Sequence, residues 1–200
     1  PDVAQIIGHQ VAIRPDEVVL LDGLRVSSPA RTWRELASIL DEADLVAAGD
    51  ALIHHARELT DINELTSVVM RDRTYPGRRY ARDALHHLSN RAESRAESLL
   101  RIALWRAGLP AMLVNQDIVD RTGSLLARVD LLFRDFPVAV EYDGDQHRTD
   151  AFQWRRDVRR LGDLEDAGIS VVRVTADDYP RFDRAISRCR LLLARGGWRQ

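Results

Sequence analysis

Apolar and polar positions follow different rhythms in the two halves of the chain. Over residues 11 to 27, short apolar stretches alternate with turn signals such as Asp22-Gly23, which predicts two or three short strands. After Ser28, a typical N-cap residue followed by proline, the apolar positions recur at helical spacing through Trp33 and Leu40. We expect further helices at about 43 to 57, 61 to 71 and 77 to 89. The first 90 residues are therefore predicted to be mostly helical.

From Glu93 onward, short apolar strands alternate with amphipathic helices. The pattern predicts a helix at 93 to 107; strands near 112 to 118, 126 to 133 and 137 to 143; a helix from about 150 to 167; a strand at 169 to 175; and a last helix to about 195. This order is typical of an α/β domain.

Length and composition set the class of protein without identifying a function. The chain has 200 residues, of which 45% are hydrophobic, enough for one large domain or two small ones. Its apolar runs are shorter than a membrane span, and no signal-peptide pattern opens the chain, so we expect a cytoplasmic protein. Because it begins at Pro1 without a methionine, we also expect a segment upstream.

Charge confines any nucleic-acid surface to a local patch. The net charge is −2, whereas proteins that bind nucleic acid over a large area are normally basic. All 29 basic residues other than histidine are arginines, since the sequence contains no lysine. Any lysine-dependent chemistry is therefore excluded.

The stretch VAVEYDGDQH, residues 138 to 147, places three carboxylates close together at the end of an apolar strand. Alternation along the strand puts Glu141 and Asp143 on one face. A two-residue loop at Asp135-Phe136 would join it to the preceding strand in a register that places Asp130 opposite Glu141. We therefore expect these acids to lie near one another.

Such a group of carboxylates has two chemical uses. It can act as a general acid and base pair, or it can bind a hard divalent cation through oxygen ligands. Mutual repulsion favours the cation, because Mg²⁺ or Mn²⁺ reverses the sign of the interaction. The alternative is that these are exposed acids at a strand end, paired with arginines such as Arg128, Arg134 and Arg148.

Five ordered motifs between residues 94 and 178 carry a resemblance to a known family. They are SRAESLLR, RVDLLF, AVEYDGDQH, RRDVRRLGDLEDAG and VVRVTADD. They resemble an uncharacterised endonuclease-like family related to very-short-patch-repair (Vsr) nucleases, within the PD-(D/E)XK superfamily. The upstream stretch GLRVSSPARTWRELA resembles, more weakly, the region that accompanies such domains in actinobacterial proteins with an AbiEi-type antitoxin segment.

The resemblance assigns roles to particular residues. Asp130 matches the aspartate of the first catalytic strand, Glu141 the acid of the second, and Glu97 the acid of the preceding helix. Asp143 stands where the superfamily usually has lysine, so with Asp130 and Glu141 it is expected to bind Mg²⁺ or Mn²⁺, which would have to activate the attacking water. His147 is the nearby group that could transfer protons at neutral pH.

The arginine-rich stretch RRDVRR suggests where DNA would bind. Arg156 and Arg160 match the family motif, and arginine suits bidentate contact with phosphate oxygens. Gln116 matches a position where the family often has glutamine, which could contact either the substrate or the protein backbone. The simpler explanation of the arginines is a solvated, ion-paired helix face.

These observations combine into one expected architecture and two candidate functions. We expect an accessory, mostly helical region at 1–90, and at 91–200 a restriction-endonuclease-like domain, with a mixed four-stranded sheet flanked by helices. The expected function is metal-dependent hydrolysis of DNA phosphodiester bonds, in repair or defence. The alternative is a nucleic-acid-binding or antitoxin-like regulator that keeps the nuclease fold without turnover.

Overall fold

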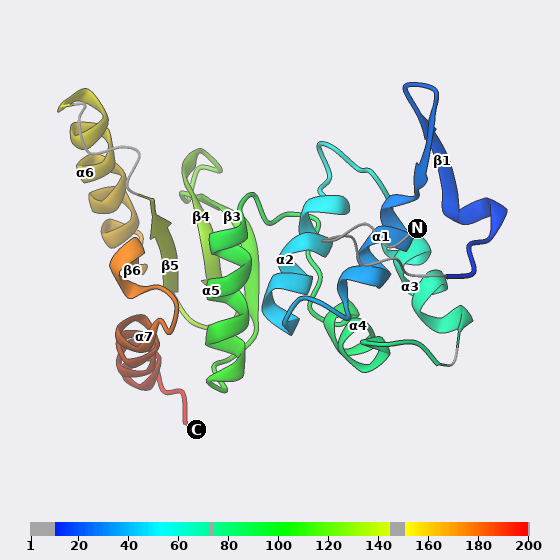
Figure 1. The fold of residues 1–200 in the computed structure, drawn as a ribbon. Coiled ribbons are helices and arrows are strands. Elements are labelled where there is room, and N and C mark those ends of the chain that lie inside the picture. The colour runs from blue at the N-terminus through cyan, green and yellow to red at the C-terminus, as the bar shows by residue number, and fades with distance from the viewer. Residues whose placement is uncertain (1–10, 73, 145–150, 200) are drawn as a thin grey trace.

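The computed structural model describes residues 11–72, 74–144 and 151–199, with only the backbone described for 151–157. The chain forms a helical N-terminal region with a short hairpin, followed by a four-stranded mixed sheet with flanking helices (Figure 1). The predicted α/β class with a mixed four-stranded sheet is confirmed at this level. No helix within the described residues is long and apolar enough to cross a membrane.

The described residues of the N-terminal region form one hairpin and four helices. A 3₁₀ turn (Pro15–Glu17) leads into the antiparallel strands β1 (Val18–Leu21) and β2 (Leu24–Ser27). The helices are α1 (Pro29–Leu36), α2 (Glu42–Leu52), α3 (Ile62–Arg71) and α4 (Arg78–Leu85). As predicted, α1 begins at a proline after an N-cap serine, since Ser28 Oγ accepts a hydrogen bond from the backbone N–H of Arg31.

The second half follows the predicted order of elements closely. Its elements are α5 (Arg95–Arg106), β3 (Met112–Val119), β4 (Leu125–Phe133), β5 (Val138–Asp143), α6 (Ala151–Asp166), β6 (Ser170–Thr175), a 3₁₀ turn (Ala176–Asp178) and α7 (Asp183–Arg195). The strand order is β3-β4-β5-β6, antiparallel except for the parallel pair β5 and β6. The parallel pair is joined through α6, as a crossover connection requires.

Helices cover both faces of this sheet. Val138 and Val140 of β5 belong to the main core, together with apolar residues of α5 and α7. Ala139, which points to the opposite face, packs in a smaller cluster with Leu164 of α6. The face that carries Ala139 is the one on which Glu141 and Asp143 fall by alternation, as the sequence predicts.

Two predicted helices run past their observed ends because the chain leaves them to make tertiary hydrogen bonds. The helix expected at 43 to 57 ends at Leu52, and His55 then donates its backbone N–H to Asn90. The helix expected at 77 to 89 ends at Leu85, and Ser89 donates its backbone N–H to Asp50. These partners are distant in sequence, so local periodicity could not reveal them.

The two halves share a core and a set of ion pairs. Trp33 of α1 and Leu100 of α5 belong to the same contiguous cluster of buried side chains. Between α2 and α5, Asp50 is buried and accepts hydrogen bonds from Ser98 Oγ and from the guanidinium of Arg101. The segment near residue 90, where the sequence predicts a domain boundary, thus lies beside a tightly packed helix pair.

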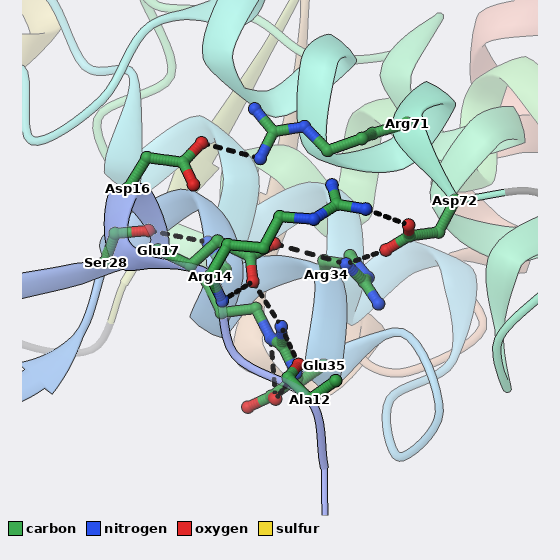
Figure 2. Close-up of polar contacts among 10 residues, drawn as sticks. Ala12, Arg14, Asp16, Glu17, Ser28, Arg34, Glu35, Arg71 and Asp72 are labelled. Atoms are coloured by element: carbon green, nitrogen blue, oxygen red, sulfur yellow. Dashed lines mark hydrogen bonds and ion pairs between the residues drawn. The ribbon is translucent and has the colours of Figure 1, made fainter.

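A second group of charged residues, with the buried Glu17, Arg31 and Arg34 at its centre, lies under the hairpin (Figure 2). Glu17, which is 2% exposed, accepts hydrogen bonds from Arg31 Nη1 at 2.6 Å and from Arg34 Nη1 at 3.4 Å. Arg34 also pairs with Asp72 at 2.7 Å, and Asp72 pairs with Arg14 at 2.9 Å. These pairs tie the base of the hairpin to α1 and to the end of α3.

Candidate active site

The expected proximity of Asp130 and Glu141 follows from the observed strand register. Leu131 pairs with Val140 and Leu132 with Ala139, which is the predicted register and places Asp130 next to Glu141 at the following position. The predicted two-residue loop is wrong, because four residues, 134–137, separate the strands. Arg134 donates its backbone N–H to Ala111 instead of continuing the hairpin, so the strands separate early without a change of register.

Asp130 has an unusually high affinity for a proton. The pKa of its carboxyl is raised from 3.8 to about 7, mainly by burial and to a smaller extent by the neighbouring Glu97 and Glu141 carboxylates. The backbone N–H of Tyr142, which donates to Asp130 Oδ2 at 2.7 Å, and the Arg160 guanidinium act in the opposite direction. Asp130 is therefore the member of the group that changes charge near neutral pH.

Glu141 is held by an arginine from α6. The residue is 7% exposed, and Arg160 donates to both of its carboxylate oxygens, with Nη2 2.8 Å from Oε2. A bidentate arginine neutralises a buried carboxylate well. Arg160, expected to contact DNA phosphate, thus lies against the acid of the second strand.

Glu97 enters the site from the first turn of α5, where Ser94 is the N-cap. It is 8% exposed, and its Oε2 accepts hydrogen bonds from the backbone N–H of Glu93 at 3.0 Å and from Asn115 Nδ2 at 2.9 Å. Among the described residues these bonds use only Oε2 of the Glu97 carboxylate.

Asn115 occupies an unusual place in β3. Its neighbours Val114 and Gln116 pair with Leu131 and Val129, so Asn115 stands opposite Asp130. Its φ is +46°, in the left-handed region that asparagine tolerates better than most residues. It is 4% exposed. The sequence carries no signal for this residue, because left-handed geometry inside an apolar strand is set by tertiary contacts.

The remaining predicted residues are distributed differently. Asp143 forms an ion pair with Arg173 of the neighbouring strand β6. The side chain of Gln116 donates to the backbone carbonyl of Asp117 at 3.1 Å, which is the backbone contact expected as one of its two alternatives. Arg128, one of the three arginines suggested as partners for the acids, pairs instead with Asp117 at 2.7 Å and with Glu93 at 3.5 Å.

Two expected site residues fall where the structure gives no description. His147 lies outside the described residues, and the side chain of Arg156 lies outside the described side chains. Their predicted roles as proton-transfer group and phosphate contact stay predictions.

The donor set suits a hard cation in its chemistry but is not assembled around one. Glu97, Asp130 and Glu141 offer carboxylate oxygens, the ligands that Mg²⁺ and Mn²⁺ prefer. Yet among the described residues no three His, Cys, Asp or Glu side chains are grouped closely enough to hold a metal ion. In addition, Arg160 donates hydrogen bonds to both carboxylate oxygens of Glu141. A cation would have to compete with Arg160 for Glu141.

The chain is thus a mixed α/β protein in which acidic residues come together from a helix and from two neighbouring strands of the sheet. The chain matches no protein-family model and no solved structure.

Two curated proteins of Mycobacterium tuberculosis are similar to this chain. Both are uncharacterized: MT2308 of the CDC 1551 strain and Rv2248 of the H37Rv strain. Each is 28% identical to the chain over 181 residues, which is 90% of this chain and 65% of the relative. The chain therefore spans about two thirds of the length of these relatives, and the similarity extends across both of its halves.

Proposed function

We propose that this chain is a metal-dependent DNA endonuclease with a restriction-endonuclease-like fold, similar to the Vsr-related family of the PD-(D/E)XK superfamily. The observation that carries the proposal is the raised pKa of Asp130, caused by burial and by the carboxylates of Glu97 and Glu141. An acid with a perturbed pKa beside other carboxylates is typical of catalytic sites. Placing Asp130 in a buried position beside two other carboxylates reduces the stability of the fold, which is consistent with selection for a chemical role.

Each acid contributes differently to the proposed reaction. Asp130 and Glu97 are each held through one carboxylate oxygen by hydrogen bonds, and in the proposed site the other oxygen binds the cation. Glu141 joins them when Arg160 moves aside. A bound Mg²⁺ or Mn²⁺ would neutralise charge on the scissile phosphate and make the attacking water more acidic. His147 is proposed to transfer protons, and Asp143 to assist once it leaves Arg173.

Arg160 also supports the second candidate, a regulator that keeps the fold without turnover. Its guanidinium already supplies Glu141 with the positive charge that a cation would bring. In such a protein the acids would form a structural ion-pair cluster, and the arginines of α6 would bind nucleic acid.

Cleavage assays separate the two candidates. Plasmid, mismatched duplex, single-stranded DNA and RNA are each incubated with Mg²⁺, Mn²⁺ or EDTA at pH 6 to 9. The endonuclease should cleave at least one substrate, more strongly with Mn²⁺ and at higher pH, and Asp130→Asn should abolish cleavage. Asp117→Asn, an exposed aspartate paired with Arg128 on the neighbouring strand, is the matched control and should remain active. Binding of DNA without cleavage under every condition would favour the regulator.

A further inference from the structure

Glu97 is the acid of the site that comes from a helix, so its position relative to Asp130 depends on how α5 is held against the sheet. An N-terminal helical turn alone leaves a glutamate side chain several rotamers. The described contacts fix this one through its Oε2 atom, which accepts from Glu93 N and Asn115 Nδ2. The second donor comes from β3, next to Asp130, and it joins the helix to the sheet at the site itself.

Asn115 is itself held from two directions. Its Nδ2 donates to the backbone carbonyl of Arg91 at 2.6 Å as well as to Glu97. In return, Arg91 Nη2 donates to the backbone carbonyl of Asn115 at 2.6 Å. This reciprocal pair links β3 to the segment before α5. Both the backbone and the side chain of Asn115 are therefore engaged.

The residue type is informative, because glycine would adopt the same backbone more easily. A φ of +46° inside a strand is unfavourable for residues with a side chain, and glycine is the usual solution. Asparagine adds a buried amide whose two N–H groups match the two acceptors present, Arg91 O and Glu97 Oε2. If the residue were needed only for its left-handed backbone conformation, the side-chain amide would have no role.

We infer that Asn115 is a positioning residue that, clamped by Arg91, holds Glu97 beside Asp130 as the third carboxylate of the proposed cation site. This inference rests on the proposed function, because holding Glu97 in place affects metal binding only if a cation binds at this site. Residues that orient metal ligands without touching the metal typically change affinity by about 10- to 100-fold when they are replaced.

Asn115→Gly separates the backbone role from the amide, since glycine keeps the left-handed conformation and loses the hydrogen bonds. We expect Mn²⁺ affinity, measured by calorimetric titration, to fall about tenfold or more. In a Glu97→Gln background the same change should alter affinity less than about twofold, because the clamp would have no charged ligand left to position. Thermal unfolding without metal shows that each variant is folded.

A second variant covers the case in which Asn115→Gly does not fold. Arg91→Met removes the exposed guanidinium from the carbonyl of Asn115 and should weaken Mn²⁺ binding. Arg79→Met is the control, because it removes the same charge from an exposed residue of α4, whose ion-pair contact is a 3.7 Å approach to Asp83. Equal Mn²⁺ affinity in Arg91→Met and Arg79→Met would overturn the inference.

The wild-type titration distinguishes failure of the inference from failure of the proposed function. If the wild type shows no Mn²⁺ binding that Asp130→Asn removes, the proposed cation site is wrong and the inference falls with it. If the wild type binds Mn²⁺ and folded Asn115→Gly binds equally well, the proposed site stands and only the positioning role is wrong.

Discussion

Two groups of acidic residues, one under the hairpin and one at the sheet, each contain a buried glutamate and are compensated differently. Under the hairpin, Glu17, Glu35 and Asp72 alternate with three arginines, Arg14, Arg31 and Arg34 (Figure 2). At the sheet, Arg160 is bound to Glu141, while Asp130 and Glu97 receive hydrogen bonds from backbone and amide groups. In the first group each acid is paired with a guanidinium. In the second group, the carboxylates of Glu97 and Glu141 still repel the charged form of Asp130.

This difference separates a structural cluster from a candidate for chemistry. A buried ion-pair network with matched charges fixes the hairpin against α1 and α3 and needs nothing further. A carboxyl whose pKa reaches about 7 is instead poised to exchange its proton for another positive charge.

Glu17→Ala should be strongly destabilising, because it leaves Arg31 and Arg34 buried without their shared carboxylate. Breaking a buried pair from one side costs about 3–5 kcal/mol. For a chain of this size the midpoint of thermal unfolding should fall by about 10 °C. Asp83→Ala, which removes an acid from exposed ion pairs at 3.7 Å, should change the midpoint little. Equal effects of the two changes would show that the hairpin cluster contributes nothing beyond surface charge.

Arg160→Met should destabilise the metal-free protein by about 1–2 kcal/mol, because Glu141 would be left buried without its partner. Mn²⁺ should raise the unfolding midpoint of this variant more than that of the wild type, since a cation no longer competes with the guanidinium. Arg159→Met, a change at the exposed neighbour on α6, is the control. An identical Mn²⁺ response in Arg160→Met and wild type would mean that Glu141 is not a ligand.

Asp130→Asn should stabilise the protein at pH 8 and not near pH 4. The folded-state pKa of about 7 lies above the ordinary value of 3.8, so the stability that Asp130 contributes is complete below pH 3.8 and is lost as the pH rises through 7. Asparagine stays neutral throughout, and the unfolding midpoint at pH 8 should rise by about 3 °C.

Asp117→Asn provides the opposite sign for this comparison. The hydrogen bond from Arg128 lowers the pKa of Asp117, so any stability it contributes is present above its unfolded value and lost in acid. Its replacement should not stabilise the protein at pH 8. If both variants gained stability at pH 8, general charge reduction would explain the result, and Asp130 would not be special.

Arg156→Ala should have the smallest effect, confined to DNA binding. If Arg156 contacts a phosphate, the slope of log affinity against log salt should flatten by about one unit, measured by fluorescence anisotropy. Stability and Mn²⁺ binding should remain unchanged. If Arg156→Ala and Arg159→Ala both keep the salt slope of the wild type, both arginines belong to the solvated face of α6.

Much of the fold was predictable because its signals are local. Ser28, Asp61 and Ser94 act as N-caps at the starts of three helices, and the register that places Asp130 beside Glu141 follows from strand alternation and a short connection. The loop length and the ends of α2 and α4 were wrong, because backbone groups there bond to partners far along the chain.

For the candidate site, the sequence by itself determined which acids exist and on which elements they lie: Glu97 on a helix, Asp130 and Glu141 on neighbouring strands. The tertiary structure decided their electrostatic state. Docking of α6 brought Arg160 to Glu141, and a left-handed residue in β3 brought Asn115 to Glu97. Periodicity reports which face of an element is buried, whereas a pKa depends on burial and on charges within a few ångströms, which only the packed chain defines.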